Sequence, residues 1–163
     1  MNKTENLKYI LDRYDHYNES VQAKSNLYLA LNTFIIGGSI TMLLSINMIK
    51  LNAVSLFMIF SIILISIVSL IVTVLALRPH LKTDSTKSMI FFNDVSSISL
   101  KDYSEKVKLM NEIEFDTDLG NQIHCIAGGL SCKYKKLKWV SYFLIFQYSA
   151  ILIWTLIFIH QNK

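Results

Sequence analysis

The sequence predicts an all-α integral membrane protein with three transmembrane helices, an N-terminal amphipathic helix and a small helical cytoplasmic module between spans two and three. Three segments, residues 25–49, 51–77 and 139–159, contain no charged residue. At about 1.5 Å per residue, the shortest of them is roughly 30 Å long as a helix, which is the thickness of the hydrocarbon core of a bilayer. The alternating pattern of a barrel strand is absent from the sequence, so helices are expected to satisfy the backbone hydrogen bonds in lipid.

The lysine and arginine residues predict the orientation of these spans. Four precede the first span, ten lie between the second and third, and the first connecting turn contains Lys50 alone. By the positive-inside rule, the N-terminus and residues 78–138 are cytoplasmic and the C-terminus lies outside. Because the first span follows a long polar segment, we expect it to be retained and not cleaved as a signal peptide. The predicted organisation is a cytoplasmic helix (1–24), a transmembrane hairpin (25–77), a cytoplasmic sensor module (78–138) and a third span (139–160).

Residues 5–24 are predicted to form an amphipathic helix that runs into the first span. Apolar residues recur at the spacing of one helical face, at Leu7, Ile10, Leu11, Tyr14, Tyr17 and Val21. Acidic residues balance the basic ones on the other face. This balance favours packing on the cytoplasmic module or on a neighbouring subunit over adsorption to the membrane surface.

The first two spans carry stripes of small and hydroxyl-bearing residues. The stripes consist of Thr33, Gly37, Thr41 and Ser45 in the first span and Ser66, Ser69 and Thr73 in the second. The turn between these spans is short, so they are expected to form an antiparallel hairpin. Two interpretations of the stripes remain open: helix packing within or between subunits, or the polar lining of a water-filled pore. No Asp, Glu, Lys, Arg or His lies in any span, which argues against a proton pump or an ion-coupled carrier.

The cytoplasmic module is expected to begin irregularly. Arg78-Pro79 ends the second span, because proline disfavours helix in the residue before it. Residues 88–92 are expected to form a short strand or packed turn, and residues 93–97 a loop.

Two helices are predicted to complete the module. Ser99, with Asp102 three residues later, is typical of a capping arrangement that opens a helix. A second cap, at Asp116 or Thr117, is expected to open a helix that continues into the third span. Gly128-Gly129 is the expected point of bending in that helix.

The residue types argue against several functional classes. The net charge of +4 is explained by anchoring to anionic headgroups, because the basic residues are interleaved with acidic ones and form no stripe for nucleic acid. Gly-rich phosphate loops and nucleophile elbows are absent from the sequence, so no enzyme activity and no catalytic residue is predicted. Cys125 and Cys132 share a helical face beside His124, but a fourth ligand is missing, and a disulfide is disfavoured in the cytoplasm. We therefore predict neither a metal site nor a disulfide.

The module contains groups suited to holding a small polar ligand. Aromatic rings can stack on a base, amides can read its edge, and a lysine can meet a phosphate. The candidate ligand-binding residues are Phe92, Asn93, Tyr103, Asp118, Gln122, His124 and Lys133. Capping and helix-surface hydrogen bonds explain the same residues about as well, so both interpretations stay open.

A series of short motifs then extends over nearly the whole chain. They are Ala23-Lys24-Ser25 with Asn32, Arg78-Pro79, Ile90-Phe91-Phe92 with Asp94, Tyr103, Asp118-Leu119 with Gln122-Ile123, and Lys133-Tyr134. In this order the sequence resembles the transmembrane effectors of the bacterial Pycsar antiphage system. One departure is Val21-Gln22-Ala23-Lys24, where the family usually has an acidic residue, one further residue and then Lys-Ala.

The resemblance implies a protein of the bacterial inner membrane that is activated by a cyclic pyrimidine mononucleotide, cUMP or cCMP, made by a partner cyclase. It implies that the activated effector impairs the membrane, so that the infected cell stops supporting the phage. We expect the protein to act as a homo-oligomer, with the lipid bilayer and the nucleotide as its other partners. Two alternatives remain: a constitutive holin-like pore-forming protein and a non-toxic structural membrane subunit.

Overall fold

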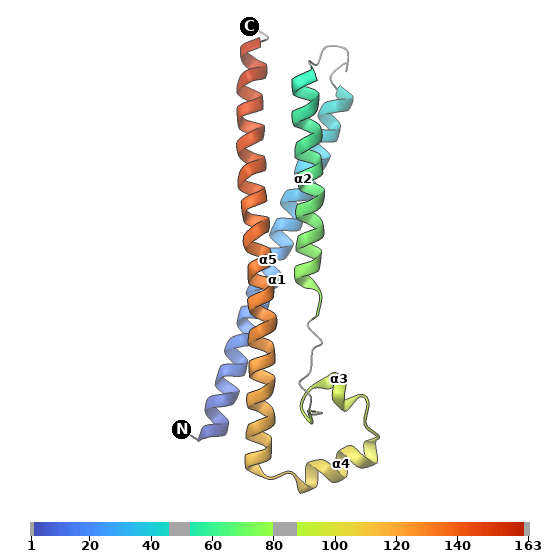
Figure 1. Cartoon of the computed structure of the whole chain (residues 1–163), viewed down its shortest axis with the longest axis vertical. Coiled ribbons are helices and arrows are strands. Elements are labelled where there is room, and N and C mark those ends of the chain that lie inside the picture. Colours follow the sequence, from blue (N-terminus) through green and yellow to red (C-terminus); the bar gives the residue numbers. More distant parts are fainter. Residues whose placement is uncertain (1, 46–52, 80–87, 162–163) are drawn as a thin grey trace. The chain divides into compact units, whose positions relative to one another are not determined.

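The computed structural model describes residues 2–45, 53–79 and 88–161. Within these ranges the regular structure is entirely helical and contains no strand. The helices are α1 (Lys3–Ser45), α2 (Ala53–Leu77), α3 (Phe92–Val95), α4 (Leu100–Leu109) and α5 (Glu112–Gln161). Figure 1 shows their order along the chain.

Contacts divide the chain into two units. The first, here called the polar unit, consists of Met1–Ser20 and Pro79–Cys132. The second, here called the membrane unit, consists of Val21–Arg78 and Lys133–Lys163. Helices α1 and α5 each contribute residues to both units.

The membrane unit packs three helix segments, from α1, α2 and α5, side by side (Figure 1). Its core is a cluster of Ile35, Ile62, Val140 and Leu144. A second cluster consists of Leu43, Ile59 and Trp154. Three described helices are long and apolar enough to cross a membrane. This confirms the predicted all-helical chain with three candidate spans.

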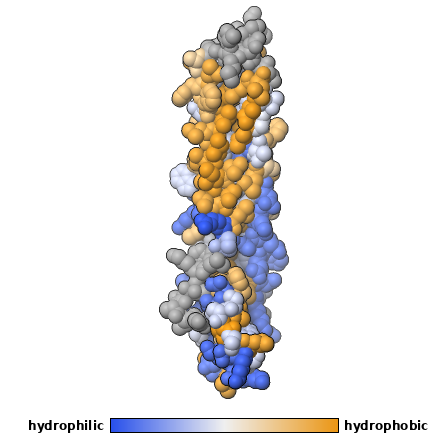
Figure 2. Space-filling view, turned by 90° about the vertical axis from the view of Figure 1, so that its right-hand side faces the viewer, coloured by the Kyte–Doolittle hydropathy of each residue, from blue (hydrophilic) through white to orange (hydrophobic). Residues whose placement is uncertain are grey.

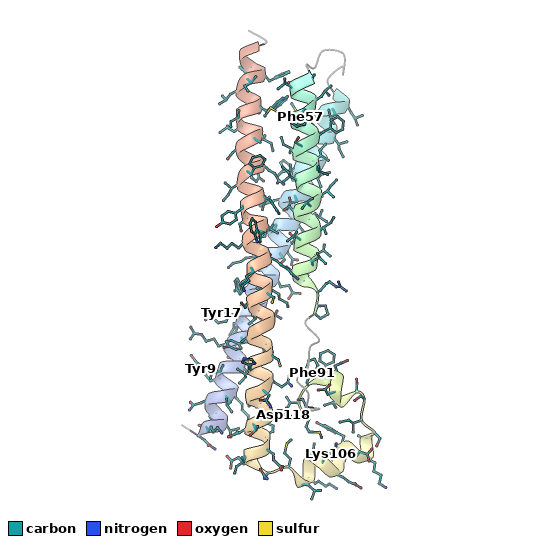
Figure 3. The ribbon with its side chains drawn as sticks, in the orientation of Figure 1. Tyr9, Tyr17, Phe57, Phe91, Lys106 and Asp118 are labelled. Carbon is teal, nitrogen blue, oxygen red and sulfur yellow. The ribbon has the colours of Figure 1, made fainter. Side chains whose placement is uncertain are left out.

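The outer surface of the membrane unit is apolar. Phe57 on α2, labelled in Figure 3, is 74% exposed, and Phe34 and Ile145 are exposed as well. On the face drawn in Figure 2, apolar side chains cover the part of the surface where these helices lie. Large apolar side chains on the outside of a bundle are expected where the surrounding medium is lipid.

Polar contacts at one end of the membrane unit hold its helices in register. Tyr28 Oη on α1 lies 2.8 Å from Ser141 Oγ on α5. The Lys136 ammonium donates to the carbonyl oxygen of Leu75 on α2 at 2.9 Å. The Lys24 ammonium also lies over the Tyr134 ring, 5.4 Å from its centroid.

The predicted cap of α4 is confirmed in the polar unit. The Ser99 hydroxyl accepts from the Asp102 backbone N–H at 3.2 Å and donates to the Asp102 carboxylate at 2.8 Å. The cap predicted at Asp116 or Thr117 is wrong, because α5 begins earlier, at Glu112. Asn111 Oδ1 accepts from the Glu114 N–H, and the Asn111 N–H donates to the Glu114 carboxylate, which is a complete capping box.

The segment before α4 is compact. Of the two expected forms, strand or packed turn, residues 88–91 adopt the turn, in which the Ser88 hydroxyl accepts from the N–H groups of Ile90 and Phe91. The buried carboxylate of Asp94 accepts from the Ser88 N–H at 3.0 Å. Part of the expected loop at 93–97 is therefore a one-turn helix, α3, because Asp94 needs this conformation to close the turn.

Candidate functional site

Asp118 is the candidate ligand residue that the structure places most firmly. It lies in the first half of α5, and its carboxylate accepts from the backbone N–H of Met89 at 2.8 Å. Figure 3 shows it on the side of α5 that faces the turn before α3, near Phe91. One oxygen of this carboxylate therefore has a structural role, because it ties residues 88–91 to α5.

An open cavity of about 280 Å³ lies beside Asp118 in the polar unit. Its lining consists of Met89, Met110, Ile113, Glu114, Thr117, Asp118 and Asn121. Two carboxylates and an amide can accept from or donate to hydroxyl and amino groups of a ligand. Among the described residues, the lining contains no lysine, arginine or histidine, so these side chains alone do not neutralise a phosphate.

Gln122 and His124 also lie on α5, one and three residues after Asn121, the last residue of the cavity lining. The Gln122 side chain is buried, whereas His124 is exposed. A buried glutamine amide needs a hydrogen-bond partner. Of the two residues, Gln122 is therefore the better candidate for a contact with a ligand. His124 points to solvent and not with Gln122, as their spacing on the helix requires.

Phe92 and Asn93 on α3 are both exposed. Phe92 is 67% exposed and touches Phe91, with the two ring centroids 4.9 Å apart. Phe92 is therefore not a core residue of this chain, and most of its ring is free for contact with another molecule. Tyr103 on α4 is half-buried.

Lys133 belongs to the membrane unit, whereas the other six candidates belong to the polar unit. The structure thus does not bring all seven together in one unit. Burial lowers the pKa of the Lys133 ammonium below its usual range.

The two predicted stripes of the membrane unit differ in what they face. Ser66, Ser69 and Thr73 on α2 are completely buried. Thr33 and Thr41 on α1 are exposed, and each hydroxyl donates to a carbonyl of its own helix, four residues back. The α2 stripe therefore faces the other helices of the unit, while the α1 stripe faces its surroundings.

The other two positions of the α1 stripe are Gly37 and Ser45. Gly37 is exposed, and a methyl group added at its Cα would meet no atom within 4 Å. The side chain of Ser45 lies outside the part of the chain whose side chains the structure describes.

Two further polar residues of the membrane unit were not predicted as site residues. Asn32 on α1 and Gln147 on α5 are both 0% exposed. One signal for Gln147 was present in the sequence, since it is the only amide in residues 139–159. In the sequence analysis Asn32 appeared only as part of the family motifs, because a single amide adds nothing to a periodic pattern.

The fold and these residues define a class: a small helical membrane protein with three candidate spans and a polar unit. The sequence model of the Pycsar effector protein domain matches residues 6–160, nearly the whole chain. The chain therefore belongs to the family of Pycsar effector proteins, which confirms the resemblance and supports an antiphage effector of transmembrane character. This family is not a known family of enzymes. Searches among curated proteins and among solved structures found no match.

Proposed function

We propose that the protein is a cyclic-nucleotide-activated effector in antiphage defence that oligomerises and impairs the integrity of the bacterial inner membrane. Membership of the Pycsar effector family supports this proposal. The structural observation that carries it is the extent of α5. The helix that holds Asp118 and Gln122 in the polar unit also supplies the third candidate span.

The proposed ligand is a cyclic pyrimidine mononucleotide, cUMP or cCMP, supplied by a partner cyclase. Phe92 offers an exposed ring on which a base can stack, and Gln122 offers an amide that can read its edge. The ribose hydroxyl is the part of such a ligand that suits the acidic cavity beside Asp118. A bound ligand shifts the protein between two packings only if it binds one of them better.

The experiment that tests the proposal measures membrane potential in bacteria that express the protein with an active pyrimidine cyclase or with an inactivated one. We expect depolarisation only with the active cyclase, and a higher melting temperature of the detergent-solubilised protein in cUMP or cCMP. Depolarisation with the inactivated cyclase would favour the holin-like pore. No toxicity with any cyclase would favour the structural subunit.

A matched pair of substitutions tests the ligand contact. Phe92→Ala is expected to remove the nucleotide-dependent rise in melting temperature without lowering the melting temperature of the free protein, because the ring is mostly exposed. Leu100→Ala is the control, since Leu100 is an apolar residue of the same unit that is 81% exposed. A lowered stability of the free Phe92→Ala protein would contradict the ligand-binding role of this ring.

A further inference from the structure

The interior of the membrane unit contains polar side chains without hydrogen-bond partners. Asn32, Ser66, Ser69 and Gln147 are all completely buried. Within the described part of the chain, five of their atoms lack a partner: Asn32 Oδ1, Ser66 Oγ, Ser69 Oγ, Gln147 Oε1 and Gln147 Nε2. Unpaired polar atoms are costly in the interior of any protein and more so at membrane depth, where no bulk water competes.

These residues come from all three helices and gather near one level. Two contacts between helices align them. Tyr28 bonds to Ser141, and Asn32 follows Tyr28 by four residues as Gln147 follows Ser141 by six, so Asn32 and Gln147 lie within about one helical turn of each other along the bundle. Lys136 bonds to the carbonyl oxygen of Leu75, and in the antiparallel α2 Ser66 lies nine residues before Leu75, close to the level of Gln147, which follows Lys136 by eleven.

Polar residues that hold transmembrane helices together do so by bonding across the contact. Within the described residues, the one side-chain hydrogen bond of this group is local: Asn32 Nδ2 donates to the carbonyl oxygen of Tyr28 on its own helix at 2.8 Å. The Gln147 side chain makes no hydrogen bond to any residue that the structure describes. Hydrogen bonding between the helices therefore does not account for these side chains.

The helices are also imperfectly packed beside this level. An apolar cavity of about 230 Å³ lies in the membrane unit and is lined in part by Ile35, Ile62 and Ile151. Loose packing lowers the contact energy that must be given up when helices move apart.

We propose that Asn32, Ser66, Ser69 and Gln147 line an aqueous pathway that forms when the three helices of the activated protein separate. The inference rests on the proposed function, namely impairment of the membrane. Water that enters the opened bundle supplies the missing hydrogen bonds, so hydration of these groups offsets part of the cost of separating the helices. Because no Asp, Glu, Lys, Arg or His lies in a predicted span, the pathway passes small hydrated ions of either sign.

Cysteine labelling tests the lining directly. Ser66→Cys is placed in a protein whose native Cys125 and Cys132 are replaced by serine, and cells are treated with a membrane-impermeant, charged methanethiosulfonate. We expect labelling only when the cyclase is active. Thr33→Cys is the control, because Thr33 follows Asn32 on α1 but is exposed on the outside of the bundle. It is expected to stay unlabelled in lipid.

The outcomes separate this inference from the function on which it rests. If Ser66→Cys stays unlabelled in depolarised cells, or if Thr33→Cys is labelled equally, these residues do not line the pathway. Neither result contradicts the effector function. If the protein with all its native residues never depolarises cells, the effector function fails and the lining fails with it.

A second variant tests the cost of the unpaired groups. Gln147→Leu keeps roughly the same volume and removes two unpaired atoms. We expect its melting temperature in detergent to rise by about 4 °C, which corresponds to an open population about tenfold smaller and a matching loss of depolarisation rate. A lower melting temperature, with unchanged depolarisation, would show that Gln147 is a structural residue and would overturn the proposal.

Discussion

Asp116 shows how a buried carboxylate ties the beginning of the chain to α5. The Thr4 hydroxyl donates to Asp116 Oδ1 at 2.7 Å, and the Lys3 ammonium lies 3.8 Å from Oδ2. The carboxylate is almost fully buried, while Lys3 is largely exposed. The hydroxyl bond is therefore the stronger of the two contacts, because an exposed ion pair contributes little.

Removal of this hydroxyl is expected to destabilise the protein. Thr4→Val should lower the free energy of unfolding by about 1–2 kcal/mol, because it leaves a buried carboxylate oxygen unpaired. Thermal unfolding in detergent measures the change. Thr117→Val is the control, since its exposed hydroxyl bonds only to the Ile113 carbonyl of its own helix. A loss as large in the control would assign the effect to helix propensity of valine and not to Asp116.

Lys133 gives a prediction that depends on pH. Its pKa is lowered by burial, so the folded protein binds this proton less tightly than the unfolded chain does. The contribution of Lys133 to the free energy of unfolding therefore rises as the pH increases from its pKa in the folded protein toward its pKa in the unfolded chain.

We expect Lys133→Met to raise the melting temperature at neutral pH, and this gain to shrink as the pH approaches 10. The response to cyclic nucleotide should be lost, if Lys133 meets the phosphate. Melting curves across this pH range measure the first effect and depolarisation the second. Lys135→Met is the matched control, because Lys135 is exposed and should change neither. A gain that does not depend on pH would contradict the role of burial.

At the scale of the element, a periodic pattern predicts that a helix has a polar face but not what this face meets. Span one and span two carry similar stripes, yet Thr33 is exposed and Ser66 is buried. The difference arises from tertiary packing, which a single sequence does not encode locally. The same reason explains why Gln147 was missed.

Helix starts were predictable where the capping residues had no competitor. Ser99 and Asp102 form the expected cap of α4. For α5, Asp116 and Thr117 are good capping residues by type, but Asn111 with Glu114 comes first and closes its own box. The Asp116 side chain does not cap the helix and instead accepts a hydrogen bond from Thr4. The three apolar spans were predictable because length and the absence of charge suffice.

The exposed α1 stripe predicts a contact between copies of the chain. Gly37→Leu should weaken the activated assembly more than Gly38→Leu does, since the two positions point about 100° apart on a helix. Gly37 lies in the stripe, whereas Gly38 lines the apolar cavity of the membrane unit. Crosslinking in membranes measures the assembly. Equal effects of the two substitutions would show that the α1 stripe does not form the contact between copies.

At the scale of the whole molecule, orientation in the membrane remains a prediction from the lysine and arginine distribution. A protein with Cys125 and Cys132 replaced by serine should be labelled from outside at Asn52→Cys and not at Asn111→Cys. An impermeant thiol reagent on intact cells measures both, and permeabilised cells give the control. The reverse pattern would place the polar unit on the side that a cytoplasmic messenger does not reach.

The division of the chain into two units has a consequence for how such proteins diversify. The backbone passes from one unit to the other at 20/21, 78/79 and 132/133, and the first and last of these crossings lie inside α1 and α5. The polar unit is therefore not a cassette that recombination can exchange at a linker. A functional chimera between two such effectors needs three junctions, and two of them must preserve the register of a continuous helix. Gradual substitution is therefore the easier route to a new ligand specificity in this architecture.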